Sequence, residues 1–306
     1  MAPTHEGDGL DGLSRSIEPF LKDVRAHVAL ASANLLPLFD TFANEARFAH
    51  EWLVPSLRGL PRGARILEVG AGLTLVSCQL VKQGYRVSAL EPIGHGFSSF
   101  RVLQELVLRY ASMQDMEPEL LPIPIERLDV PDTFDLAFSV NVMEHVDNVG
   151  LALECVGRAL KPEGVYRFTC PNYTFPYEPH FDIPTLFSKT LTQRVFHKRI
   201  YQSTQIEDQA GLWRSLNWIS VWSVAKACRL AVGLRPSFDR TMVCQTFERL
   251  GRDAVFAGRR SRWVVVLARW MVRWRFHKAL AWVPAVLQPV IDCSVLRSGQ
   301  ISGRSL

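Results

Sequence analysis

The sequence Ile66-Leu67-Glu68-Val69-Gly70-Ala71-Gly72-Leu73-Thr74 decides the fold of this chain. Its first four residues form a short apolar run of the kind that makes a buried β-strand, and Gly70 and Gly72 break that run. Residues 73–83 then have helical periodicity, and Gly84 closes the helix. This order predicts a tight glycine turn at which the backbone can approach a ligand closely, next to the free N–H groups that begin a helix.

An acidic residue follows this turn at an informative distance. Glu91 stands at the end of the next β-type run, residues 85–90, and a carboxylate there can accept hydrogen bonds from both ribose hydroxyls of an adenosine. A nicotinamide dinucleotide is disfavoured because Leu75 occupies the third glycine position of its GxGxxG fingerprint. Glu68 would also repel a pyrophosphate, whereas it suits a ligand with an ammonium group. A plain structural turn is the remaining alternative.

Strand-type and helix-type runs alternate along the first 173 residues. Further strands are expected at 134–140 and 165–170, further helices at 97–111 and 150–160, and one or two amphipathic helices at 17–57 with a break near Leu36-Pro37. Such alternation predicts an α/β domain with a mostly parallel sheet.

Composition excludes several classes of protein. The chain has 306 residues, of which 48% are hydrophobic and 21% charged, so it is neither a disordered chain nor a coiled coil. Its six cysteines are scattered and predict neither a disulfide framework nor a zinc site. No secretory signal and no spanning segment are recognisable, since the uncharged run at 279–291 is short and contains two prolines. We therefore expect a cytoplasmic protein.

The loop PNYTFPYEPHF at 171–181 resembles a subset of bacterial methyltransferases that often act on glycan or envelope precursors. Four motifs in order resemble the class I S-adenosylmethionine-dependent methyltransferases of the small-molecule type. They are ILEVGAGLT at 66–74, VSALEP at 87–92, FDLAFSVNVMEHV at 134–146 and RALKPEGVYRFTCPN at 158–172. The resemblance implies a Rossmann-like, doubly wound sheet of seven strands, with a helical cap inserted before a last strand near 290–296. The chain then divides into a flexible N-terminus (1–16), N-terminal helices (17–60), a cofactor-binding core (61–180), a helical cap with the substrate region (181–288) and the last strand with a tail (289–306).

The resemblance also implies which residues hold S-adenosylmethionine. Gly70 and Gly72 pass under its methionine part beside Glu68, Glu91 holds the ribose, and Asn141 and Val142 line the sulfonium side. The family places an acidic residue for the adenine where this chain has Pro124. Either Glu126 or backbone groups take that role here.

Two histidines follow the fourth and fifth expected strands, where ligands of open parallel sheets bind. His180 is the candidate general base for an acceptor hydroxyl, with Glu178 or Glu144 orienting it, and no metal is required. Its alternative role is a hydrogen-bonded loop residue that shapes the pocket. His145 is a further catalytic candidate, although a structural role in capping the next helix is favoured. The stiff, aromatic loop at 171–181 predicts substrate contacts from three residues, Asn172, Tyr173 and Tyr177.

The C-terminal part of the chain differs from the rest. Seven of the eight tryptophans lie beyond residue 212. Residues 251–306 hold ten basic and two acidic residues, so this stretch has a net charge of +8, whereas the whole chain has a net charge of +5. Helical periodicity at 262–274 places Arg262, Arg269 and Arg273 on one side, with Leu267 and Trp274 among the apolar residues opposite. Residues 262–283 are either a cap over the substrate site or a helix that lies on anionic lipid. The acidic remainder of the chain disfavours nucleic acid as a partner.

The sequence therefore predicts methyl transfer from S-adenosylmethionine to a hydroxyl or amine of a small-molecule acceptor, such as a sugar or a lipid-linked envelope precursor. The reaction is an in-line displacement with a histidine base, in the cytoplasm or at the inner membrane face. A catalytically inactive scaffold or peripheral membrane subunit is the alternative, which the intact glycine turn and its acids argue against. Hydride transfer is a weaker third option.

Overall fold

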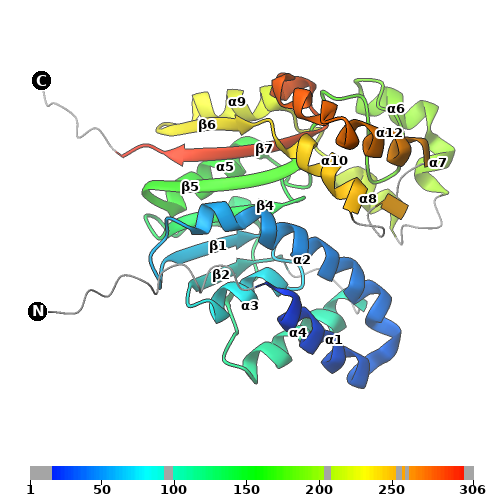
Figure 1. The fold of residues 1–306 in the computed structure, drawn as a ribbon. Helices are drawn as coiled ribbons and strands as arrows, with labels where there is room; N and C mark the ends of the chain where they lie inside the picture. The colour runs from blue at the N-terminus through cyan, green and yellow to red at the C-terminus, as the bar shows by residue number, and fades with distance from the viewer. Residues whose placement is uncertain (1–15, 93–98, 203–207, 253–256, 259–261, 300–306) are drawn as a thin grey trace, which may run out of the picture. The chain divides into compact units, whose positions relative to one another are not determined.

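The strands of this protein build the α/β sheet that the glycine motif predicts. The computed structural model describes residues 16–92, 99–202, 208–252, 257–258 and 262–299. Within them the strands are β1 (Arg65–Val69), β2 (Arg86–Leu90), β3 (Glu119–Leu121), β4 (Phe134–Val140), β5 (Leu160–Pro171), β6 (Leu234–Asp239) and β7 (Val290–Arg297). The order in the seven-stranded sheet is β3-β2-β1-β4-β5-β7-β6 (Figure 1).

Pairing within the sheet is mostly parallel. β1 pairs in parallel with β2 and β4, and β2 with β3, whereas β7 runs antiparallel to both β5 and β6. Four of the five residues of β1 and of β2 are buried, as expected for strands that helices cover on both faces. The predicted Rossmann-like fold is confirmed.

Helices begin and end where the sequence provides the signals. Pro37 lies in the first turn of its helix and accounts for the expected break, and Gly84 has a φ of 92° just after the helix that follows the glycine turn. In the first half of the chain the helices are α1 (Glu18–Ser32), α2 (Leu36–Leu57), α3 (Leu75–Lys82), α4 (Ser99–Ser112) and α5 (Val149–Ala159). Beyond β5 they are α6 (Lys189–Val195), α7 (His197–Tyr201), α8 (Gln209–Ser215), α9 (Val221–Leu230), α10 (Met242–Arg252) and α12 (Arg262–Arg273).

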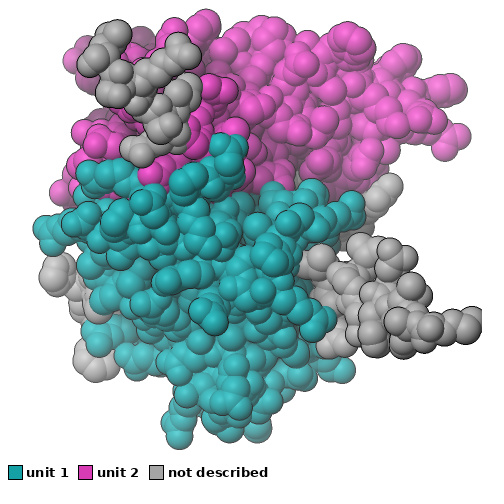
Figure 2. Space-filling model, turned by 90° about the vertical axis from the view of Figure 1, so that its left-hand side faces the viewer, with its two compact units in different colours: residues 1–139, 158–164 teal, residues 140–157, 165–306 magenta. Residues whose placement is uncertain are grey.

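The chain forms two compact units, coloured separately in Figure 2. One contains residues 1–139 and 158–164, and the other contains residues 140–157 and 165–306. Fully buried Phe134 and Phe138 lie in the first unit, and Tyr166, Phe168 and Trp213 lie in the second. The division expected from the sequence, with a cap at 181–288, follows function rather than compactness and stays a prediction. Its flexible N-terminus lies outside the described residues, apart from Ser16.

Three local features differ from the expectations. β3 has only three residues, none of them buried, so it carries no apolar run that a sequence could reveal. β6 lies within the stretch that was expected to form a helical cap, and it pairs with the last strand in the same sheet. The helical stretch expected at 262–283 ends at Arg273, and a 3₁₀ helix at Phe276–Trp282 follows it.

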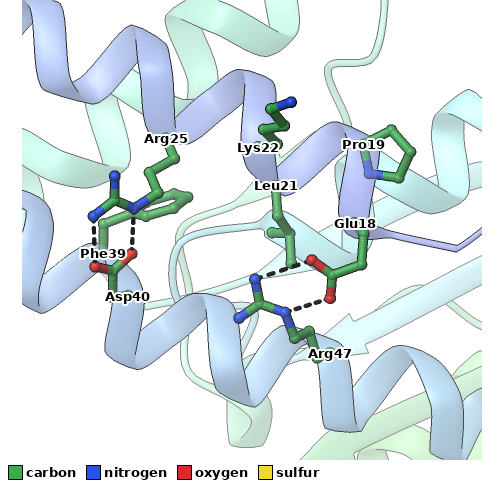
Figure 3. A pocket seen from close by; sticks show the side chains of 8 residues that line it. All are labelled: Glu18, Pro19, Leu21, Lys22, Arg25, Phe39, Asp40 and Arg47. Carbon is green, nitrogen blue, oxygen red and sulfur yellow. Dashed lines mark hydrogen bonds and ion pairs between the residues drawn. The ribbon is translucent and has the colours of Figure 1, made fainter.

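A groove of about 560 Å³ lies between α1 and α2 in the first unit (Figure 3). Its charged side chains pair with each other, since Arg25 binds Asp40 at 2.8 Å and Arg47 binds Glu18. These pairs join the two N-terminal helices across an exposed surface. The groove contains none of the residues that the sequence motifs single out.

Candidate active site

The glycine turn has the backbone geometry that its sequence predicts. Gly70 and Gly72 have φ values of 69° and 52°, in a backbone region that residues other than glycine rarely adopt. The Gly70 N–H donates to the carbonyl of Leu90 at 2.7 Å, which ties the turn to the end of β2. Thr74, also with a positive φ, then leads into α3.

Three side chains hold this turn in place. The Gly72 N–H donates to Oε2 of Glu91 at 2.8 Å, and Nε2 of Gln104 donates to the Gly72 carbonyl at 2.6 Å. A Cβ at Gly72 would lie 3.7 Å from the ring of Phe42, so α2 covers the turn closely. Gln104 and Phe42 could not be predicted from the sequence, because an amide and a phenyl ring on amphipathic helices carry no sign of what they face.

Glu68 is buried at the end of β1, directly before the turn. The Oγ of Ser77 donates a hydrogen bond to it, and desolvation raises the pKa of this carboxyl to about 8. Glu91 is also partly buried, and burial raises its pKa as well. In its ionised form Glu68 favours a cationic group at the turn and disfavours a phosphate.

The stretch that was predicted to contact the adenine contains a short 3₁₀ helix. Glu126 lies half-buried in a 3₁₀ helix at Ile125–Arg127, and Pro124 before it is extended with a φ of −68°. The proposed choice between Glu126 and backbone groups stays open.

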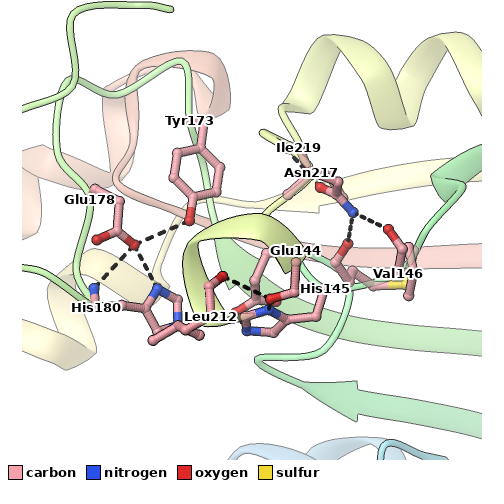
Figure 4. Close-up of polar contacts among 11 residues, drawn as sticks. Glu144, His145, Val146, Tyr173, Glu178, His180, Leu212, Asn217 and Ile219 are labelled. Carbon is pink, nitrogen blue, oxygen red and sulfur yellow. Dashed lines mark hydrogen bonds and ion pairs between the residues drawn. The ribbon is translucent and has the colours of Figure 1, made fainter. Parts of the chain in front are cut away.

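In the second unit, Asn217 clamps the loop that follows β4 (Figure 4). Its Nδ2 donates to the carbonyls of Met143 and Val146, both at 2.8 Å, and its backbone N–H donates to the carbonyl of Glu144 at 2.8 Å. Asn141 opens this loop with a φ of 55°, and its N–H donates to Thr169. Asn217 comes from the linker between α8 and α9, more than seventy residues away, so the sequence gives no sign of the contact.

Glu178 organises the loop that follows β5. This fully buried carboxylate accepts from Nδ1 of His180 at 2.6 Å, from the His180 N–H at 3.1 Å, from the Phe181 N–H at 2.7 Å and from the Tyr173 hydroxyl at 3.3 Å (Figure 4). Because Nδ1 carries the hydrogen that Glu178 accepts, Nε2 of His180 is the nitrogen with the lone pair. The expected pairing of Glu178 with His180 is present.

His145 does not cap the following helix, which corrects the favoured expectation. Asn148 accepts from the Leu151 N–H at the start of α5, while Nδ1 of His145 lies 2.8 Å from the hydroxyl of Ser215. The rings of His145 and His180 meet edge to face at 5.4 Å. Burial, and then the neighbouring His180, lower the pKa of His145 to about 4, so it is neutral at physiological pH.

Glu144 completes this group of side chains. It is fully buried, and its Oε1 lies 3.9 Å from Nε2 of His145. Glu144, His145 and His180 each present one potential metal-ligand atom, and these atoms lie within 4.8 Å of one another. The loops after β4 and β5 thus bring together two imidazoles and a carboxylate within one unit.

The three expected substrate contacts differ in their surroundings. Asn172 is buried, and its Nδ2 donates to the carbonyl of Gln288 at 2.8 Å, with two further carbonyls near, so it is part of the loop's framework. Tyr173 is buried and stacks on Trp218 at 4.4 Å between ring centres, and its burial raises the pKa of its hydroxyl. Tyr177 is half-buried and donates to Asp182 at 2.7 Å.

Comparisons with known proteins agree with this architecture. A family model described as a methyltransferase domain matches residues 67–168. The chain is 45% identical over 285 residues to the uncharacterized protein Rv1509 of Mycobacterium tuberculosis (strain ATCC 25618 / H37Rv), covering 93% of this chain and 96% of that protein. Over 110 residues it is 27% identical to the ubiquinone biosynthesis O-methyltransferase of Rickettsia typhi, covering 36% of this chain and 42% of that one.

The chain is also similar to a solved structure. An S-adenosylmethionine-dependent methyltransferase from Mesorhizobium loti is 16% identical and superposes with a TM-score of 0.49, covering 80% of this chain and 97% of that one.

The glycine turn, its two acids and the strand order define a class I S-adenosylmethionine-dependent methyltransferase. The methyltransferase domain match covers the turn, both acids and most of the stretch from β1 to β5. The chain belongs to the same family as the uncharacterized protein Rv1509, with which it shares almost its full length. The cofactor is S-adenosylmethionine. Glu68, Gly70, Gly72 and Glu91 fit it, because the buried acid at the turn suits the ammonium group and the acid after β2 suits the ribose.

Proposed function

We propose that this methyltransferase transfers the methyl group to a hydroxyl or amine of a small-molecule acceptor, and that His180 receives the acceptor's proton. The observation that supports the proposal is the 2.6 Å hydrogen bond between Nδ1 of His180 and the fully buried Glu178. It fixes the ring orientation, sets the tautomer and stabilises the imidazolium that forms, as a carboxylate does behind a catalytic histidine.

S-adenosylmethionine supplies an electrophilic methyl carbon and a thioether leaving group. The chain's own residues align and deprotonate the acceptor. Nε2 of His180 takes the proton of the acceptor hydroxyl or amine, while bound S-adenosylmethionine would supply the methyl group and would leave as the thioether. His145, neutral and turned edge-on to His180, adds no competing positive charge beside the base.

We propose a sugar or lipid-linked envelope precursor as the acceptor, in the cytoplasm at the inner membrane face. Two observations support parts of this proposal, the first a small-molecule acceptor and the second a reducing compartment. The loop after β5 combines aromatic and polar side chains around Glu178, which is a usual composition for a small-molecule pocket. All six cysteines are free thiols, in keeping with a reducing compartment. Among the described residues no helix has the length and apolar character needed to cross a membrane.

Isotope transfer tests the acceptor class. The purified protein is incubated with S-adenosylmethionine labelled in its methyl group and with polar and lipid extracts of a bacterial envelope. We expect label in a lipid fraction, released with a sugar by mild acid. Label confined to protein or nucleic acid would contradict the proposed acceptor. Inhibition of the same label transfer by added S-adenosylhomocysteine serves as the specificity control.

Divalent cations give a second test, because the ligand atoms of Glu144, His145 and His180 lie within 4.8 Å of one another. We expect methyl transfer to survive EDTA, since proton transfer to His180 needs no metal. Added Zn²⁺ should inhibit, because an imidazole nitrogen that binds zinc has no lone pair left for a proton. Initial rates with EDTA, and with zinc before and after chelation, measure both effects. Loss of activity in EDTA, restored by a cation, would instead assign the three residues to a catalytic metal site.

A further inference from the structure

The outward surface of α12 and of the 3₁₀ helix after it combines aromatic and cationic side chains. We call the set of exposed residues at 262–282 the arginine–tryptophan face. Its tryptophans Trp270, Trp274 and Trp282 are 51%, 61% and 84% exposed. Its other exposed members are Arg262, Val266, Leu267, Arg269, Arg273, Arg275, Phe276, Lys278 and Ala279. Exposed tryptophans at this density need an explanation in terms of a partner, because single apolar residues are normal on surfaces but clusters are not.

The opposite side of α12 is already packed. Ala268 is fully buried against Leu250 and Ala257, and Val264 and Val265 join this cluster. Figure 1 shows α12 beside α10. The arginine–tryptophan face is therefore not the core side of a displaced helix, since the helix has buried its own core side within the same unit.

Sequence order on α12 divides the exposed side into two strips. At about 100° per residue, Arg262, Arg269 and Arg273 fall within about 40° of one another, and Trp270, Trp274 and Leu267 form the strip next to them. The ring of Trp270 meets that of Phe276 at 5.4 Å, which extends the aromatic strip into the 3₁₀ helix. Such a division lets aromatic side chains and guanidinium groups reach one surface together.

Charge indicates the partner. Residues 262–291 contain five basic and no acidic residues, so the face offers no carboxylate to complement a second copy of itself. Glu248, on α10, lies 3.0 Å from the buried His277 and so pairs inward. Tryptophans settle at the boundary between headgroups and acyl chains, while arginines bind phosphates there.

We propose that the arginine–tryptophan face docks on the surface of an anionic lipid bilayer. α12 then lies in the plane of the interface, with the tryptophan strip at the acyl boundary and the arginine strip at the phosphates. The face belongs to one unit and requires no particular chemistry at the active site, so this inference stands apart from the proposed function. If both hold, docking brings the enzyme to a lipid-linked acceptor.

Vesicle sedimentation tests the proposal with the full chain. Vesicles of phosphatidylcholine, with or without phosphatidylglycerol, are mixed with protein at low and at physiological salt. We expect pelleting with the anionic vesicles, weaker at higher salt, and a blue shift of tryptophan fluorescence. Each removed cation should reduce the partition coefficient by about five-fold. Absence of pelleting with anionic vesicles at low salt would overturn the proposal.

Paired variants separate this face from other surfaces. We expect Trp270→Ala with Trp274→Ala, and Arg269→Glu with Arg273→Glu, each to reduce binding at least ten-fold. Trp222→Ala is the matched control, because Trp222 is 63% exposed but lies on α9. Thermal unfolding and S-adenosylhomocysteine binding verify that each variant is folded. Light scattering tests for a dimer, and gel shifts test for a nucleic-acid complex. If these same substitutions abolish either of those complexes while vesicle binding persists, the lipid assignment is wrong.

Discussion

Replacing His180 with alanine should reduce the turnover number by about 10²- to 10⁴-fold, the usual contribution of a positioned general base. The alanine has no nitrogen to take the acceptor's proton, and Glu178 loses the imidazole that it orients at 2.6 Å. Cofactor affinity should stay within about two-fold, because Glu68, Gly72 and Glu91 belong to another loop and another unit. Single-turnover rates with saturating acceptor, and calorimetry with S-adenosylhomocysteine, measure the two quantities separately.

Further variants distinguish the base from a loop residue that only shapes the pocket. His180→Gln retains a donor for Glu178 but has no basic nitrogen, so we expect it to be as slow as the alanine variant. His197→Ala is the matched control, because His197 is an exposed histidine of the same unit. If His180→Gln turns over at the normal rate, His180 is not the base. If His180→Ala loses cofactor binding along with turnover, that substitution has disturbed the fold. The turnover of His180→Gln then decides whether His180 is the base.

The backbone parts of the site could be predicted from the sequence, and many of its side-chain supports could not. Gly70 and Gly72 are readable because a positive φ leaves few alternatives to glycine, and Glu91 is readable because the strand that carries it fixes its place. The side chains of Gln104 and Asn217 are ordinary amides in the sequence. The carbonyls to which they donate lie 32 residues away for Gln104, and 71 and 74 residues away for Asn217. A hydrogen bond of this kind leaves no local pattern.

Helical periodicity likewise identified α12 but not its exposed side. The apolar half predicted for this helix includes Leu267 and Trp274, yet both are exposed in the structure, while Ala268 is the residue that is fully buried. A periodic pattern gives the angle between residues but not the direction of the neighbour. The small Ala268 allows α10 to approach closely, which turns the bulky tryptophans outward.

Cofactor affinity should depend on pH through Glu68. In the structure its pKa of about 8 leaves this carboxyl protonated at pH 7, because it is desolvated. The ammonium group of the cofactor favours the carboxylate, so binding below pH 8 must release a proton. The affinity for S-adenosylhomocysteine should therefore rise by up to about ten-fold per unit between pH 6 and pH 7.5 and level off near pH 8. Calorimetry in two buffers of different ionisation enthalpy measures both the affinity and the proton release.

Glu68→Gln should remove this dependence and bind about 10- to 100-fold more weakly at pH 8, since an amide cannot pair with an ammonium group. Glu51→Gln, at an exposed carboxylate of α2, is the matched control and should retain the slope. Stability should change in the opposite direction. A folded-state pKa raised above the unfolded value gives stability that is present in acid and is lost as the pH rises through about 8. The glutamine variant should therefore unfold at a higher temperature than the natural protein at pH 8, while binding its cofactor less tightly. An unchanged pH slope in this variant would show that the titrating group lies elsewhere, and the acid at the glycine turn would then not be the partner of the ammonium group.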